Sequence, residues 1–238
     1  MNALEVIQRA TKTVGIPTPN VALASTDVQV VQLVELLNNE CRELGSRYPW
    51  QALTFEQTFT TVATQSQGTL ASLLTGGREL RYIVNETIWN RTSREPVYGP
   101  RSGRTWQGYE AVSITSPYSE YRIRGNELLF LPAPTAGQTC AFEYVTRSTM
   151  TDSLGVTYRR NAVADTDLLL LDDEIILMGV VWRWRKAKGM EYAEDFASYE
   201  RMVADAMARD GTKPTLSLSG GGVFNDDIPM AIPRLIGS

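Results

Sequence analysis

The sequence contains no histidine and only two cysteines among its 238 residues. Without histidine the chain lacks the most common general base and the most common zinc ligand, and no Ser-His-Asp triad is possible. Cys41 and Cys140 are far apart and each lies among apolar residues. We therefore expect buried free thiols rather than a disulfide, which fits assembly in a reducing cytoplasm. We predict no catalytic residues, no metal and no cofactor.

Long hydrophobic runs are also missing. A membrane-spanning helix needs about 18 to 20 consecutive apolar residues, and the longest run, "LLLLDDEIILMGVVW", is interrupted by Asp172, Asp173 and Glu174. The first residues, "MNALEVIQRATK", are amphipathic and include Glu5, which is not typical of a signal peptide. The net charge is −4, so the surface as a whole does not attract nucleic acid. We expect no membrane association.

Four segments have the three- and four-residue periodicity of amphipathic helices. Two precede residue 50: one ends before "GIPTP", and the other opens at "STDVQ", with Thr26 and Gln29 at capping-box spacing and Gly45 as the expected C-cap. Two follow residue 165 and are separated by Gly189. The apolar stripes are Leu4, Ile7, Thr11 and Val14; Val30, Val34, Leu37, Cys41 and Leu44; Leu171, Ile175, Met178 and Trp182; and Tyr192, Phe196, Tyr199, Val203 and Ala206.

Between these helical pairs the pattern changes to that of strands. "TFEQTFTTVATQ" and "QTCAFEYVTRS" are rich in β-forming residues, and the second places Cys140, Phe142 and Tyr144 on one face. "YRIRGNELLFLPAP" predicts a hairpin with a two-residue turn, Gly125-Asn126, of the type whose first central residue must be glycine. "GRTWQGYEAV" has the spacing of a short helical turn, and "GVTYRRNAVADTD" reads as a polar link.

The predicted fold class is α+β. Residues 1–49 and 165–211 form a four-helix bundle of two N-terminal and two C-terminal helices, because their apolar stripes are complementary. Residues 50–164 form a small antiparallel β domain inserted into that bundle. Residues 212–238, "TKPTLSLSGGGVFNDDIPMAIPRLIGS", have neither helical nor strand periodicity but are too apolar for an idle disordered tail, so we expect an extended tail that docks on a partner.

Motifs for chemistry are weak. The glycine-rich "LTGGRE" and "SLSGGGVF" lack the lysine and hydroxyl of a P-loop and the glycine spacing of a dinucleotide turn. The three carboxylates of "LLDDEII" suit the N-terminal end of a helix dipole, and a divalent ion held by Asp172 and Asp173 is the weaker interpretation. Eight glutamates lie in the β region, but no feature selects a catalytic pair for glycoside hydrolysis.

The segment "VVWRWRKAKG" combines aromatic and basic residues. On a helix Trp182 and Trp184 are about 200° apart, so one is expected to face the bundle core and the other to face outward or into a neighbour. Basic residues also suit the C-terminal end of a helix. Contact with DNA is the competing interpretation.

Several blocks taken together resemble the head-to-tail adaptor (connector) proteins of short-tailed bacteriophages, the group that includes tail tubular protein A. The blocks are "MNALEVIQRATKTVGI", "YPWQALTFEQTFTTVATQ", "IVNETIWNRTSREPVYGP", "YRIRGNELLFLPAPTAGQTCAFEYV" and "LLDDEIILMGVVWRWRKAKGMEYAEDFASYERMVADAMARDG". The resemblance implies a structural virion protein, not an enzyme. It also implies a helical bundle carrying a β domain, in a ring of twelve copies. The ring lies beneath the portal at the head-tail junction, extends the DNA channel and receives the downstream tail or nozzle protein; the protein is made in the host cytoplasm.

Three groups of residues become candidates on this view. A closed ring needs two different complementary patches on each subunit, and candidates are Trp184, Arg183, Arg122, Arg124, Arg91 and Arg94. A mildly acidic channel wall lets DNA slide without specific binding, and candidates are Glu191, Glu194, Asp195 and Asp205. The tail residues expected to enter grooves of the portal are Leu216, Leu218, Val223, Phe224, Ile228, Met230, Ile232 and Leu235.

The residues are also compatible with three different functions. The first is another tail structural or receptor-binding module, in which Trp89, Trp106 and Tyr109 of the β domain line a glycan groove. The second is a DNA-binding regulator that uses "RWRKAK", and the third is a virion glycosidase. The tail, in turn, could pack on its own subunit or on an adjacent adaptor subunit instead of on the portal.

Overall fold

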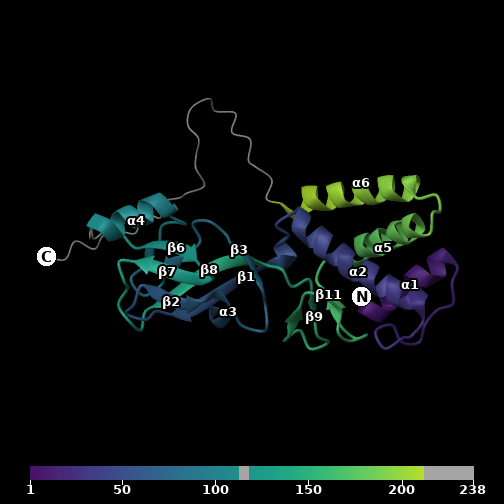
Figure 1. The fold of residues 1–238 in the computed structure, drawn as a ribbon, viewed down its shortest axis with the longest axis horizontal. Coiled ribbons are helices and arrows are strands. Elements are labelled where there is room, and N and C mark those ends of the chain that lie inside the picture. Colours follow the sequence, from purple (N-terminus) through teal and green to yellow (C-terminus); the bar gives the residue numbers. More distant parts are fainter. Residues whose placement is uncertain (113–117, 212–238) are drawn as a thin grey trace, which may run out of the picture.

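The computed structural model describes residues 1–112 and 118–211. Two lobes lie along the long axis of the molecule, with helices α1, α2, α5 and α6 in one and most of the strands in the other (Figure 1). Each lobe has its own cluster of buried apolar residues. The mixed α+β class is therefore confirmed. The predicted docking tail, residues 212–238, lies outside the described residues.

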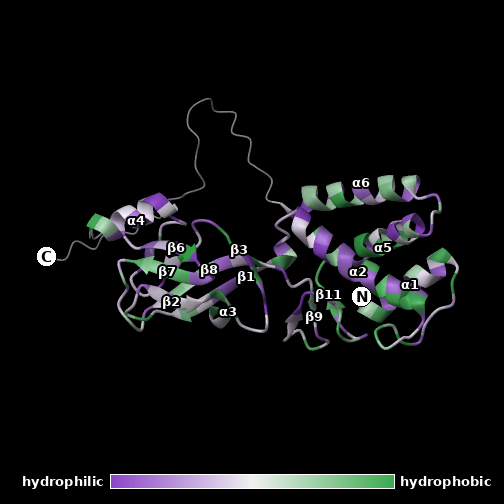
Figure 2. Ribbon diagram, viewed as in Figure 1, coloured by the Kyte–Doolittle hydropathy of each residue, from purple (hydrophilic) through white to green (hydrophobic). Residues whose placement is uncertain are grey.

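All four predicted long helices are present, and α5 packs against each of the other three. Hydrophobic and hydrophilic residues are interleaved along them (Figure 2), as amphipathic helices around a shared core require. The buried residues Ile7, Leu37, Ile176 and Tyr199 each come from a different helix and belong to one cluster. The helices are α1 (Ala3–Val14), α2 (Val28–Arg47), α5 (Asp173–Ala187) and α6 (Ala193–Asp210).

Helix α2 differs from its prediction at both ends. Its N-cap is Asp27, whose carboxylate accepts a hydrogen bond from the Gln29 backbone N–H at 2.8 Å, so the prediction of a Thr26–Gln29 capping box is wrong. Gly45 does not end the helix, which continues to Arg47. Gly45 instead lies against the Thr149 side chain, where a Cβ would sit 3.0 Å from a methyl carbon. The glycine thus serves close packing inside a helix.

The β lobe is organised around strand β8, which pairs antiparallel with β1 over seven residues, from Thr54 opposite Val145 to Thr60 opposite Thr139. The first sheet has the order β1-β8-β4-β5, with β3 also on β8, and the second has the order β2-β7-β6. The strands are β1 (Thr54–Thr60), β2 (Ser66–Thr69), β3 (Leu80–Ile83), β4 (Trp89–Asn90), β5 (Glu95–Pro96), β6 (Glu120–Arg124), β7 (Glu127–Leu131) and β8 (Thr139–Thr146).

Aromatic rings fill the space between these sheets. Phe59 contacts Phe130 and Phe142 edge to face, with ring centroids 6.1 and 6.0 Å apart, a favourable arrangement of aromatic quadrupoles. Cys140, Phe142 and Tyr144 are buried in the same cluster, as their alternation predicts. Three short helices occur among the described residues: η1 (Gln51–Leu53), α3 (Leu70–Leu73) and α4 (Gly103–Val112), the last of which is the predicted helical turn.

The β6–β7 hairpin is present, but its turn is of a different type from the one predicted. Gly125 has φ 58° and Asn126 has φ 66°, so both central residues are left-handed. This is the type I′ geometry, in which asparagine is one of the few non-glycine residues tolerated. The prediction of a turn that needs only its first residue to be glycine is therefore wrong.

A third sheet, which was not predicted, lies in and on either side of the segment expected to be a polar link, residues 155–167. Its strands are β9 (Met150–Thr151), β10 (Tyr158–Arg159) and β11 (Leu168–Leu169), in the order β10-β9-β11. The buried Asp167 carboxylate holds the adjoining loop, because it accepts hydrogen bonds from the backbone N–H groups of residues 163 and 164 and pairs with Arg159. Strands of two residues are too short to show an alternation of apolar and polar residues, so the sequence pattern did not indicate them.

Candidate interaction surfaces

A buried polar cluster joins three helices of the helical lobe. The Glu40 carboxylate on α2 is fully buried. It lies 2.7 Å from the Arg183 guanidinium of α5 and accepts a hydrogen bond of 2.6 Å from the Tyr199 hydroxyl of α6. Arg183 also bonds Glu43 at 2.9 Å. Charge-assisted hydrogen bonds of this kind fix geometry as well as contributing energy, so this cluster sets how the helices meet.

Gly179 makes room for the cluster. A Cβ at this position of α5 would lie 2.2 to 2.5 Å from the carboxylate atoms of Glu40, which no side chain tolerates without movement. Burial raises the pKa of Glu40, and the attraction of Arg183 and the Tyr199 hydrogen bond oppose that rise. The pKa of Tyr199 is also raised, by burial first and by Glu40 second. The hydroxyl therefore stays protonated and able to donate.

The segment "WRWRKAK" on α5 lies differently from its prediction. Trp182 and Trp184 are both buried, with 7% and 3% of their surface exposed, so the expectation that one of them faces outward is wrong for the isolated subunit. The basic side chains have internal partners as well: Arg185 pairs with Asp195, and the Lys188 amine lies 4.4 Å from the Trp184 ring centroid. The residues that suggested DNA contact are thus engaged within the subunit.

The remaining interface candidates are all on the β lobe. Arg91 pairs with Glu56 at 2.6 Å. Arg91 and Arg94 line one hollow of about 540 Å³, with Trp89 beside them. Arg122 and Arg124 belong to β6 in the other sheet, so the structure groups these four arginines into two pairs.

Of the three residues proposed to line a glycan groove, one is not available at the surface. Trp106 is fully buried in α4 and donates a hydrogen bond of 2.9 Å to Glu110. It therefore cannot line a groove. Trp89 is 45% exposed, and Tyr109 is half-buried with its hydroxyl directed at Glu120.

The acidic channel candidates all lie on α6 or just before it. Glu191, Glu194 and Asp205 are exposed, whereas Asp195 is half-buried and paired with Arg185. The nearby carboxylates at the start of α5 have structural roles: Asp172 caps the helix and Glu174 pairs with Arg9. Nowhere in residues 1–112 and 118–211 do three or more metal-ligating side chains gather.

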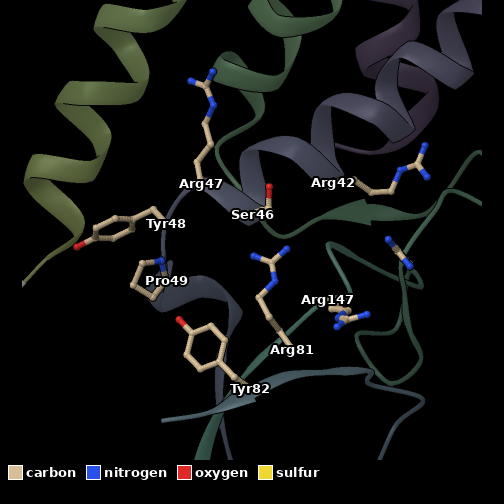
Figure 3. A pocket seen from close by; sticks show the side chains of 9 residues that line it. Arg42, Ser46, Arg47, Tyr48, Pro49, Arg81, Tyr82 and Arg147 are labelled. Carbon is tan, nitrogen blue, oxygen red and sulfur yellow. The ribbon is translucent and has the colours of Figure 1, made fainter. Parts of the chain in front are cut away.

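An arginine pocket, which no sequence pattern predicted, lies between the two lobes. It has a volume of about 340 Å³. The Arg81 side chain reaches from β3 toward the C-terminal end of α2, with Arg147 beside it (Figure 3). The lining residues are Arg42, Ser46, Arg47, Tyr48, Pro49, Arg81, Tyr82, Arg147 and Arg160. These residues are dispersed over more than a hundred positions, so no local motif indicated them.

Carboxylates do not balance this pocket. Arg47 pairs with Glu200 at 2.8 Å. Among the described residues, no carboxylate lies within ion-pair distance of the other four arginines; Arg81 donates instead to the backbone carbonyl of Gly45. The pKa of Arg81 is lowered by burial first and then by the charges of Arg147 and Arg160. The pocket is therefore a concave site with a surplus of positive charge.

The model of one protein family, SU10 adaptor protein, matches residues 1–219 of this chain. A search of curated proteins finds no match. In the part of the chain that the structure describes, no helix is both long and apolar enough to cross a membrane.

The close approach at Gly179 provides a testable contrast. Gly179→Ala forces a methyl group against the buried Glu40 carboxylate, and we expect it to lower the free energy of unfolding by about 2–3 kcal/mol despite alanine's better helix propensity. Gly108→Ala in α4 is the matched control, because no atom lies within 4 Å of the added Cβ; it should stabilise by up to about 1 kcal/mol. Urea unfolding measures both. Equal effects of the two substitutions would contradict this account.

The buried carboxylate also predicts a pH dependence. Because the pKa of Glu40 is raised in the folded state, the folded protein binds a proton more readily than the unfolded chain. Its contribution to stability is therefore fully present below the unfolded pKa and is lost as pH rises through the folded pKa. The free energy of unfolding of the unmodified protein should fall, relative to that of Glu40→Gln, as pH rises from about 4 to about 8. Urea titrations across this range measure it, and parallel curves would refute the prediction.

Proposed function

Because the chain belongs to the SU10 adaptor protein family, a family of phage structural adaptors, we propose that its copies form a ring of twelve beneath the portal at the head-to-tail junction. The ring extends the DNA channel and provides the platform on which the downstream tail or nozzle protein docks. The family match over residues 1–219 is the observation that carries the proposal.

The distribution of charge supports assembly into a closed ring. Such a ring joins two different surfaces of each subunit. The β lobe of this subunit offers exposed arginines, among them Arg94 and Arg124, and α6 offers exposed carboxylates such as Glu194 and Asp205. We propose the first group for contacts between subunits and the second for the channel wall, where repulsion between carboxylates and phosphates keeps DNA free to slide.

The C-terminal tail is proposed as the portal-binding element. Eight of its apolar residues, from Leu216 to Leu235, are the predicted contacts, and glycines and prolines interrupt the segment that carries them. This composition suits an extended peptide that lies in a groove of a partner. Twelve tethered copies act together, so a modest affinity of each tail suffices for a stable joint.

Negative-stain electron microscopy of the purified protein mixed with its portal tests the ring. We expect portal particles that carry one additional ring of twelvefold symmetry. The portal alone and the adaptor alone are the controls. Unchanged portal particles at micromolar adaptor concentrations would contradict the proposal.

Deleting residues 214–238 tests the tail separately. We expect the truncated protein still to unfold in one cooperative transition while its affinity for the portal falls at least tenfold, because the apolar contacts are gone. Isothermal titration of the portal with each protein measures this. Unchanged affinity would rule out portal docking through the tail. The ring proposal would not be affected, because electron microscopy tests it separately.

A further inference from the structure

Four of the five arginines that line the arginine pocket have no carboxylate partner in the part of the chain that the structure describes. Arg42, Arg81, Arg147 and Arg160 converge on one hollow with no carboxylate of the described residues at ion-pair distance. The C-terminal end of α2 offers only the partial negative charge of its last carbonyls. Like charges held this close repel one another, so an anionic group is strongly favoured there.

The shape and lining of the pocket favour a peptide carboxylate. A hollow of about 340 Å³ accepts a few side chains, whereas duplex DNA needs an open surface along its backbone. Arginine guanidinium groups bind carboxylates with paired hydrogen bonds. Tyr48, Pro49 and Tyr82 add apolar surface to the same site, which suits an acidic residue flanked by apolar ones.

The described chain ends beside this pocket. Gly211 closes α6 against Tyr48, close enough that a Cβ on Gly211 would lie 2.4 Å from the tyrosine hydroxyl. The sequence that follows contains only two acidic side chains, Asp226 and Asp227, which stand between the apolar Phe224 and Ile228.

We propose that the arginine pocket is a carboxylate-binding site whose occupant, in the free subunit, is the Asp226–Asp227 pair of the same chain. Asp226 lies fifteen positions after Gly211, a span of up to about 50 Å when extended, which is ample for a site next to the starting point. The cost of closing such a loop grows slowly with its length, and tethering places the aspartates at millimolar effective concentration.

This arrangement does not rest on the ring or on portal docking. It has one consequence for them: the apolar tail residues are held on the subunit before assembly, and a partner that binds them must displace the aspartates from the pocket. The segment is thereby kept from exposing its apolar side chains before a partner is present.

A disulfide trap in the full chain tests the contact. Ser46→Cys places a thiol at the pocket, and Ile228→Cys places one next to the aspartates. We expect an intramolecular disulfide under mild oxidation, formed at least tenfold faster than in a control pair that combines Ile228→Cys with Ser93→Cys on the β lobe. The native Cys41 and Cys140 are buried and do not compete.

Charge-neutral variants decide whether the aspartates are responsible. Asp226→Asn with Asp227→Asn should slow trapping at least tenfold and increase phenylglyoxal modification of Arg81, read by mass spectrometry. Glu194→Gln with Asp205→Asn changes the net charge equally and should alter neither. Trapping at the control rate, trapping that is only intermolecular, or Arg81 reactivity unaffected by the asparagine variants would each overturn the proposal.

Discussion

The helical lobe depends on one buried interaction, the contact of the Glu40 carboxylate with Arg183 and Tyr199. A charge taken out of water is costly unless it is paired and hydrogen-bonded, and here the two partners come from two further helices. The register of α2, α5 and α6 is therefore fixed at a single point, with Gly179 leaving the space that the carboxylate needs.

Arginine serves two purposes in this chain. On α5, Arg183 and Arg185 form ion pairs inside the subunit. The neighbouring lysines lie over aromatic rings. Around the pocket between the lobes, only Arg47 pairs with carboxylates, and the other four arginines have no ion-pair partner among residues 1–112 and 118–211. An adaptor that binds other chains needs surfaces like this pocket, because positive charge that is not paired within the subunit is available to a partner. The family match and this distribution of charge thus support the same interpretation.

Much of the architecture was predictable because it rests on periodicity. The four long helices and the β6–β7 hairpin follow from apolar spacing and from one glycine-asparagine turn. The wrong predictions concern contacts between residues distant in sequence. The local pattern suggests a helix end at Gly45 because it does not reveal the neighbouring Thr149. It also suggests that one of Trp182 and Trp184 faces outward or into a neighbour, whereas both are buried because α5 packs against three other helices. The small third sheet and the arginine pocket were missed for the same reason. Each brings together short segments that have no pattern of their own.

The central claim is that the chain acts by assembling and not by catalysis, as a ring between portal and tail. A cryo-EM reconstruction of the head-to-tail junction in intact virions tests this most directly. The account predicts a closed ring of this two-lobed fold directly beneath the portal, with the carboxylates of α6 facing the DNA channel. A junction in which the portal contacts the tail protein without this chain between them would contradict it.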